Sequence, residues 1–447
     1  MKYIKLSLMA LVLMGVTTSC FKMEEADIFD QNAAERLENA KNEYSKMLTD
    51  KGGVWAMEYF ANTGEPGYVY VMKFNKDGSV DISGDNKWVA EGLGQSETFA
   101  TKNSMWEVIT DDGPVLTFNT YNPIFHIFAN PEDIPDTEEE DEQGYGHEGD
   151  YEFDIMSVQG DTLFVEGKKY RLPIIMYRLS EETQPVDYFA GINKILQSTN
   201  ITKFPDLLLT AGNGHKYIVN DISTLIPSFY EQGGYKIVDQ VSANAIATEK
   251  GFRFIVPLEL YNTTGEAPVP SGYYVQHFEL QQDGSFLCTD DNVSRITSLP
   301  VNEIFPVQSY AWEIESTTLA GEFATRFATL AAEVKGGAMR ATLKGFQFKY
   351  DTKQKSYSFY YEAGSRKGNF WLNEYAFDGT NNVKFTPTGT NDSNGGVLLK
   401  NAASAQSFLD FVFSTSYDIV QENKLNPSRL KLVSKANPED FFFVNVK

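Results

Sequence analysis

Short runs in which apolar and polar residues alternate are the commonest pattern along this chain, and they predict β-strands. In YVYVMKF, alternate residues from Tyr68 to Phe74 share one face, and the turn residues NKDG follow before the alternation resumes at Val80. This pattern predicts a β-hairpin. Phe, Tyr and Trp make up 14% of the chain, and aromatic residues are enriched in strands.

A second alternating run, FRFIVPLELY, places apolar residues at every other position. One predicted face carries Phe252, Phe254, Val256, Leu258 and Leu260. Pro257 has no backbone N–H to donate, so this strand is expected at a sheet edge.

Helical periodicity is confined to a few segments. Asn32 followed by Glu35 predicts a capping box for a helix that runs to about Leu48. Further helices are predicted in VDYFAGINKILQ from Val186, in TRFATLAAEV from Thr325, and in SAQSFLDFVFSTSYDIVQ near the C-terminus. The predicted fold class is therefore α+β and mainly β. Antiparallel aromatic-rich sheets are expected in two or three lobes, with the N-terminal helix packed on the first.

The domain organisation follows from length and from breaks in the pattern. A chain of 447 residues is long enough for about three domains. The polar stretch SEETQP, residues 180–185, is the clearest boundary. We expect an N-terminal β-rich domain with its leading helix at 29–180, and a C-terminal β-rich region at 186–447 with a weaker break near Ser316.

The N-terminus has the layout of a secretory signal. Two lysines precede the apolar stretch LSLMALVLMGV, which is too short to span a bilayer. The following TTSC resembles a bacterial lipobox, although Thr17 stands where Leu is usual. We predict a signal peptide at 1–19, lipidation of Cys20, and a flexible acidic tether at 20–28. A signal cut elsewhere would leave Cys20 unmodified.

The residues after Cys20 bear on localisation. Lys22 with Glu24 and Glu25 is similar to the export signal of Bacteroidetes surface lipoproteins, although Met23 interrupts it. The resemblance implies a protein of the outer membrane that is held by its lipid anchor and faces the cell exterior. A solvated charged tether is the alternative interpretation.

Charge and cysteine content limit the remaining partners. The formal net charge of −23 would repel phosphate backbones, and no basic stripe is present, so a nucleic acid partner is not expected. The chain has 2 cysteines. Acylation of Cys20 would leave Cys288 without a disulfide partner. In FLC, Cys288 is predicted to be a small core residue instead of a nucleophile.

An acidic tract between Glu132 and Asp154 is the most unusual local feature. Clustered carboxylates can supply oxygen ligands to Ca²⁺, the one cofactor that the sequence suggests, although the spacing lacks the EF-hand pattern. A hydrated loop between two strands is the simpler interpretation. The candidate metal ligands are Glu138, Glu139, Glu140, Asp141 and Glu142.

Two tryptophans are candidate ligand-binding residues. Trp88 in SGDNKWVAEG and Trp371 in GNFWLNEYAFDGTNN lie near turn signals, where loops contact ligands, and their rings could stack on sugars. Burial in the core is the alternative for both. The chain has no H-E-x-x-H, C-x-x-C or G-x-S-x-G motif. No catalytic residue is therefore nominated.

Several segments in a fixed order carry a family resemblance. They are the signal ending at Cys20, FDQNAAERLENAKNEYSKML, GGVWAMEYF, YVYVMKFNKDGSV, LTFNTYNPIFHIFANP and GDYEFDIMSV. This order resembles an uncharacterised family of Bacteroidetes surface lipoproteins with a domain of unknown function, often encoded beside SusC/SusD-like uptake systems. The resemblance implies an accessory protein that binds a glycan or peptide nutrient for such an importer. An extracellular hydrolase and a structural or adhesive surface protein are the alternatives.

Overall fold

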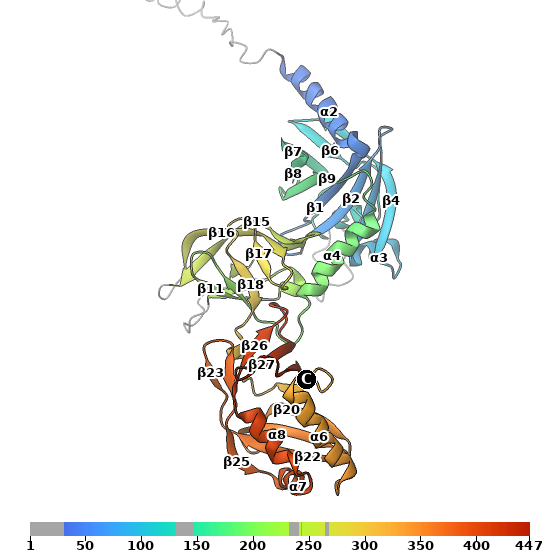
Figure 1. The fold of residues 1–447 in the computed structure, drawn as a ribbon. Helices are drawn as coiled ribbons and strands as arrows, with labels where there is room; N and C mark the ends of the chain where they lie inside the picture. Colours follow the sequence, from blue (N-terminus) through green and yellow to red (C-terminus); the bar gives the residue numbers. More distant parts are fainter. Residues whose placement is uncertain (1–30, 131–145, 232–240, 243, 264–267) are drawn as a thin grey trace, which may run out of the picture.

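The computed structural model describes residues 31–130, 146–231, 241–242, 244–263 and 268–447. Within these residues the chain forms three curled antiparallel sheets, one after another along the sequence, with helices packed against them (Figure 1). The predicted mainly β, α+β fold is confirmed. We call each sheet with its packed elements the first, second and third lobe.

The first lobe has nine described strands, in the order β4-β3-β2-β1-β9-β8-β7-β6-β5. They are β1 (Val54–Tyr59), β2 (Tyr68–Phe74), β3 (Ser79–Asp85), β4 (Phe99–Met105), β5 (Glu107–Thr110), β6 (Pro114–Thr117), β7 (Glu152–Gln159), β8 (Thr162–Gly167) and β9 (Pro173–Arg178). The predicted hairpin is confirmed, because β2 pairs with β3 with Phe74 opposite Val80.

The helical elements of the first lobe either precede β1 in the sequence or lie in connections between its strands. They are α2 (Ala33–Thr49), η1 (Lys51–Gly53), α3 (Lys87–Leu93) and η2 (His126–Ala129). The predicted capping box is present, since the Asn32 side chain accepts from the Glu35 N–H and the Glu35 carboxylate accepts from the Asn32 N–H. Helix α2 packs on this lobe, with Leu48 fully buried.

The second lobe follows α4 (Pro185–Thr199), a helix that confirms the prediction made from Val186. Its nine described strands lie in the order β13-β12-β11-β10-β18-β17-β16-β15-β14. They are β10 (Leu207–Thr210), β11 (Lys216–Asn220), β12 (Ser228–Glu231), β13 (Val241–Ser242), β14 (Ala245–Ala247), β15 (Gly251–Thr263), β16 (Pro268–Leu280), β17 (Phe286–Cys288) and β18 (Arg295–Ser298), with η3 (Ile222–Thr224) between β11 and β12.

The third lobe has ten described strands, in the order β23-β24-β26-β27-β28-β19-β20-β21-β22-β25. They are β19 (Ala311–Ile314), β20 (Leu343–Asp351), β21 (Ser356–Ala363), β22 (Arg366–Leu372), β23 (Ala376–Asp378), β24 (Asn382–Lys384), β25 (Pro387–Asn391), β26 (Ser416–Gln421), β27 (Arg429–Ser434) and β28 (Phe441–Val446). Its helices are α5 (Val301–Ile304), α6 (Glu322–Gly336), α7 (Ser393–Asn401) and α8 (Ser404–Phe413).

All three described sheets share one feature of topology. The first and last strands of each sheet along the chain are hydrogen-bonded neighbours, namely β1 with β9, β10 with β18, and β19 with β28. In each sheet, the first and last strands along the chain therefore form an adjacent pair near the centre, and the strands between them in sequence lie on either side of this pair. The second sheet ends at Ser298 and the third begins at Ala311, a few residues before the weaker break expected near Ser316.

The structure corrects two predictions made from hydrophobic pattern. The C-terminal helix ends at Phe413, and the rest of its predicted span forms β26, because Tyr417 and Ile419 are buried with a period of two. Val256, predicted to face the core, is 50% exposed. A register shift in the β15–β16 pair between Arg253 and Leu258 explains this, since a bulge turns the intervening side chains.

Candidate functional site

A cavity of about 360 Å³ lies where the first and second lobes meet. This volume is near the lower end of the range for small-molecule sites. Glu58, Thr162 and Tyr177 contribute to one wall, from β1, β8 and β9. Arg253, His277 and Glu279 contribute to the other, from β15 and β16, together with the turn before β15.

In the wall from the first lobe, both faces of β1 are covered, and all six of its residues are buried. Trp55, Met57 and Tyr59 point into the core of the first lobe. Val54 and Ala56 point the other way and join the core that continues into the second lobe. Glu58 shares that second face by alternation, so a carboxylate is placed on an otherwise apolar surface.

The wall from the second lobe is built by one hairpin. Arg253 on β15 lies directly opposite His277 on β16, so their side chains share a face. Their neighbours Phe252 and Phe278 point into the core of the second lobe and stack with ring centroids 5.1 Å apart. Alternation along the two strands therefore separates an aromatic core face from a polar cavity face.

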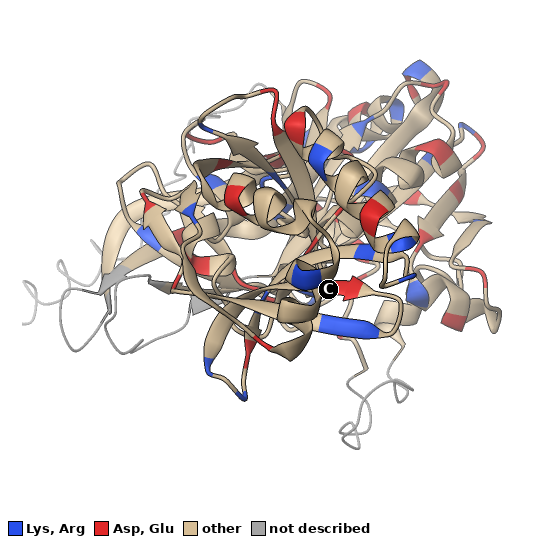
Figure 2. Ribbon diagram, turned by 60° about the horizontal axis from the view of Figure 1, so that its bottom comes forward, with Lys and Arg blue, Asp and Glu red and all other residues tan. Residues whose placement is uncertain are grey.

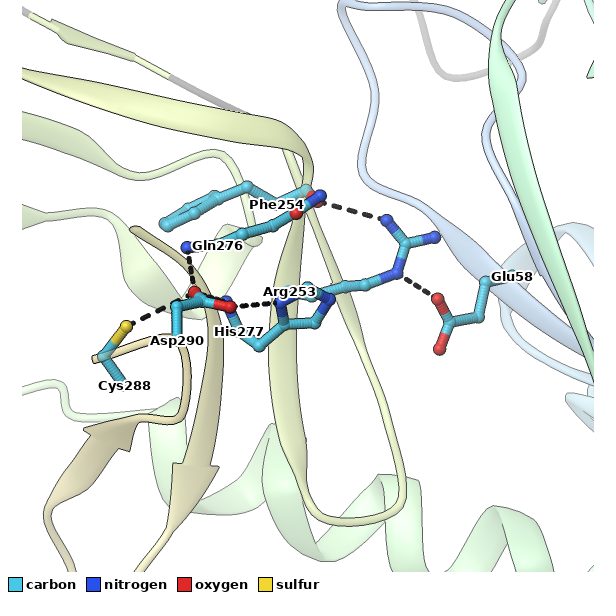
Figure 3. Close-up of polar contacts among 7 residues, drawn as sticks. All are labelled: Glu58, Arg253, Phe254, Gln276, His277, Cys288 and Asp290. Atoms are coloured by element: carbon cyan, nitrogen blue, oxygen red, sulfur yellow. Dashed lines mark hydrogen bonds and ion pairs between the residues drawn. The ribbon is translucent and has the colours of Figure 1, made fainter. Parts of the chain in front are cut away.

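A buried ion pair joins the two walls. Arg253 reaches from β15 to the first lobe, where its Nε donates to the carboxylate of Glu58 (Figure 3). The two residues are 3% and 4% exposed. Arg253 Nη1 donates to the Phe254 carbonyl at 3.1 Å. Its Nη2 is buried and has no hydrogen-bond partner among the described residues.

Asp290 organises the polar groups on the far side of Arg253 (Figure 3). It accepts from the backbone N–H groups of Gln276 and His277 at 2.7 and 2.9 Å. The His277 Nδ1 lies 2.8 Å from Asp290 Oδ1, and the Cys288 thiol donates to Oδ2, the oxygen that accepts from the backbone, at 3.4 Å. Burial alone would raise the pKa of Asp290, but the hydrogen bonds from His277 and Gln276 lower it more, so its pKa lies below the ordinary value.

The Cys288 thiol is not prepared for nucleophilic attack. Burial, followed by the charges of Asp290 and Asp291, raises its pKa to about 12. A nucleophilic cysteine needs a lowered pKa and a neighbouring base. The prediction that Cys288 is a core residue is confirmed, because it is 0% exposed.

Tyr177 supplies a hydroxyl to the wall of the first lobe. This hydroxyl is hydrogen-bonded to that of Tyr188 on α4. Burial, and then the nearby Tyr188 and Glu58, raise the pKa of Tyr177 well above its ordinary value. The phenol therefore stays protonated and can act as a hydrogen-bond donor.

Neither candidate tryptophan lines this cavity. Trp88 is 4% exposed on α3, its Nε1 donates to the Tyr68 hydroxyl at 2.8 Å, and its ring lies edge-on to His147. Trp371 is partly exposed on β22, opposite Ser358. Trp88 therefore lies in the core of the first lobe. This burial is the alternative that the sequence left open for Trp88, and Asn86 caps the short helix α3 that carries it.

The other predicted site residues lie outside the described part of the chain. These are the lipidation site Cys20, the export-signal residues Lys22, Glu24 and Glu25, and the candidate Ca²⁺ ligands from Glu138 to Glu142. Among the described residues, no group of three or more His, Cys, Asp or Glu side chains is arranged to hold a metal ion. The described helices also include none long and apolar enough to cross a membrane.

The sequence interpretation missed Glu58 and Arg253. A single charged residue between apolar neighbours, as in both strands, normally faces solvent. Only the packing of two lobes against each other reveals that both are buried. Elsewhere along the ribbon, acidic and basic residues alternate over many helices, strands and turns (Figure 2).

Residues 25–266 match the family described as Domain of unknown function (DUF4302). The chain belongs to this family. The match includes Glu58 and Arg253 and ends before β16. The comparison with curated proteins found no match. Among solved structures, the beta subunit from DNA polymerase of Streptococcus pyogenes aligns at 10% identity over 94% of this chain and 93% of that chain, with a TM-score of 0.13. A TM-score this low does not establish a common fold.

Proposed function

We propose that this DUF4302 protein is a lipid-anchored accessory protein of the bacterial cell surface. It binds a nutrient, a glycan or a peptide, and passes it to a SusC/SusD-like outer-membrane importer, with no chemistry of its own. The observation that supports binding is the cavity between the first two lobes, with its buried Arg253–Glu58 pair. Membrane attachment and the importer rest on the sequence resemblance.

The buried ion pair favours a binding role over a purely structural one. Desolvating two charges costs several kcal/mol per ion, and an apolar pair of similar size would often be as stable. The side chains nevertheless meet beside a cavity, where one guanidinium nitrogen has no partner among the described residues. A buried donor without a partner is costly, and a ligand that accepts from it would recover that energy.

The position of α2 is compatible with attachment through Cys20. Helix α2 extends from the first lobe with its N-terminal end directed away from the second and third lobes (Figure 1). Residues 20–31 could span at most about 40 Å when fully extended. An acyl chain on Cys20 would therefore hold the first lobe near the membrane and leave the third lobe farthest from it.

The hydrolase alternative receives no support from the most obvious cluster of reactive side chains. Within the described residues, the Cys288 thiol contacts the Asp290 carboxylate and makes no contact with the His277 imidazole. Catalysis by a cysteine needs the imidazole to accept the thiol proton. The arrangement therefore stabilises the β16–β17 region and does not activate the sulfur.

Affinity capture tests the proposed function. The tagged full chain is purified from detergent-solubilised outer membranes, and its partners are identified by mass spectrometry. The Cys20→Ala variant is the matched control, and it should leave the membrane fraction and fail to incorporate labelled palmitate. We expect an importer component with the native chain. The proposal fails if no importer component is captured and the chain binds nothing on glycan and peptide arrays.

A further inference from the structure

Several charged side chains line the cavity, and three of them matter for the ligand. Glu249 and Lys250, on the turn before β15, are exposed, and Glu279 on β16 is partly buried. Among the described residues, none of the three makes a side-chain hydrogen bond or ion pair. The cavity therefore carries uncompensated charges of both signs.

Arg253 adds a buried positive group to this set. Glu58 occupies its Nε, and the Phe254 carbonyl occupies its Nη1. Nη2 is the remaining nitrogen of the guanidinium, and it is buried without a described partner. It carries two N–H donors, so it can donate to a second carboxylate while Nε stays bonded to Glu58.

Negative groups lie within reach of the same space. Glu249 acts electrostatically on Tyr177 of the opposite wall and on Tyr188 of α4, so its carboxylate lies near the wall of the first lobe as well as its own. Glu58, Glu249 and Glu279 together outnumber the cations Lys250 and Arg253. A ligand with only negative charge would be repelled, and a neutral sugar would leave the unpaired charges uncompensated.

From this distribution of charge we infer that the ligand is a short peptide with free termini. Its carboxylate accepts from Arg253 Nη2 and pairs with Lys250, while its ammonium group pairs with Glu249 and Glu279. The inference rests on the proposed binding function and names the ligand class for the same cavity. A volume of about 360 Å³ suits a small ligand.

Calorimetric titration of the full chain with trialanine tests this inference. The matched ligands are N-acetyl-trialanine, which lacks the ammonium charge, and trialanine amide, which lacks the carboxylate. Each cap should weaken binding by roughly tenfold or more, because a charge-assisted hydrogen bond is lost. A neutral trisaccharide, maltotriose, is titrated in parallel.

Variants locate the binding in this cavity. The double variant Glu249→Gln, Glu279→Gln should weaken trialanine and leave N-acetyl-trialanine unaffected. Arg253→Lys keeps a cation beside Glu58 but removes the free nitrogen, so it should weaken trialanine and leave trialanine amide little changed. Glu97→Gln, at an exposed position of the first lobe, is the control and should change nothing.

The outcomes separate the inference from the proposed function. Equal binding of free and capped peptides, or no effect of the double variant, overturns the inference. If maltotriose binds, trialanine does not, and Arg253→Lys abolishes maltotriose binding, the ligand class is wrong and the binding function stands. If no peptide or glycan binds here or on the arrays, both fail.

Discussion

The first and second lobes meet across a cavity and a buried ion pair, whereas the second and third meet through aromatic rings and through hydrogen bonds such as that from the Ser298 N–H to the Lys424 carbonyl. At the latter junction, Phe204 stacks on Trp312 with centroids 6.2 Å apart and lies 5.0 Å from the Tyr310 ring. The Tyr310 hydroxyl donates to the Lys203 carbonyl, and the Trp312 indole donates to the Phe305 carbonyl. This junction resembles an ordinary protein core.

The difference suggests what each junction does. Aromatic packing helps to hold the second and third lobes together, and the Tyr310 hydroxyl and the Trp312 indole N–H still form hydrogen bonds. The junction of the first two lobes also contains apolar contacts, including Val69 and Val71 in the core shared with α4. It nevertheless places Glu58 and Arg253 in the same interface. We interpret the first junction as one that combines adhesion with binding, and the second as adhesion alone.

Removing Glu58 should have the largest effect. Glu58→Ala leaves Arg253 buried without its counter-charge, which should lower the free energy of unfolding by about 3–5 kcal/mol. Urea denaturation measures the loss. Lys435→Ala breaks the exposed pair with Asp418 and should cost at most about 1 kcal/mol.

The double variant Glu58→Ala, Arg253→Met sharpens this prediction. Removing both charges should restore much of the stability that Glu58→Ala loses, because no uncompensated ion remains buried. A Glu58→Ala variant as stable as the native chain would show that the ion pair is not buried in solution.

Gly67→Ala should weaken the contact between β14 and the first lobe. The Gly67 N–H donates to the Ala245 carbonyl at 2.9 Å, and an added Cβ would lie 2.7 Å from the Ile246 Cβ. We expect a loss of about 1–3 kcal/mol from overpacking, measured by thermal unfolding. Gly113→Ala is the control, because nothing lies within 4 Å of its added Cβ. Equal stability of the two variants would contradict the close contact.

Phe204→Leu should have a smaller effect at the aromatic junction. The substitution keeps an apolar side chain but loses the ring contacts with Tyr310 and Trp312, so the expected cost is about 1 kcal/mol. Urea denaturation measures it, with Tyr121→Leu as control because Tyr121 is 66% exposed. If Phe204→Leu also altered ligand binding in the cavity between the first and second lobes, the two junctions would not be independent.

The smallest effect should appear in the pH dependence of stability near the cavity. Asp290 has a pKa below the ordinary 3.8, so its stabilising contribution is present above about pH 4 and is lost as pH falls through the lower value in the folded protein. Asp290→Asn should therefore destabilise the chain at pH 6, and the difference from the native chain should shrink toward pH 3. Urea midpoints across this range measure it, with Glu97→Gln as control. A difference that grows on acidification would reverse the assigned sign.

Local patterns in the sequence correctly predicted several strands and helices. The hairpin from Tyr68, the capped helix from Ala33 and the helices near Val186 and Thr325 follow from alternation, periodicity and capping, which depend on neighbouring residues. The short helices α3 and α7 were not predicted, because each has too few residues to show a helical repeat of apolar positions and each is flanked by residues typical of turns.

The cavity could not be predicted from the same patterns. Glu58 and Arg253 are 195 positions apart in sequence, and each is flanked on both sides by apolar residues of its strand. Sequence alternation shows which residues share a face of a strand but does not show what covers that face. Trp88 illustrates the same limit, because its burial depends on His147 and Phe128 from distant segments.

The sequence by itself determined the strand-rich composition, the main helices, the acidic surface and a candidate lipidation site, because these depend on local order and on composition. Tertiary structure decided which polar residues are buried, since the second lobe covers the outer face of β1 and brings Arg253 to Glu58. A charge on a strand costs little in water and several kcal/mol inside a protein. The packing of the lobes therefore turned two ordinary polar positions into the candidate site.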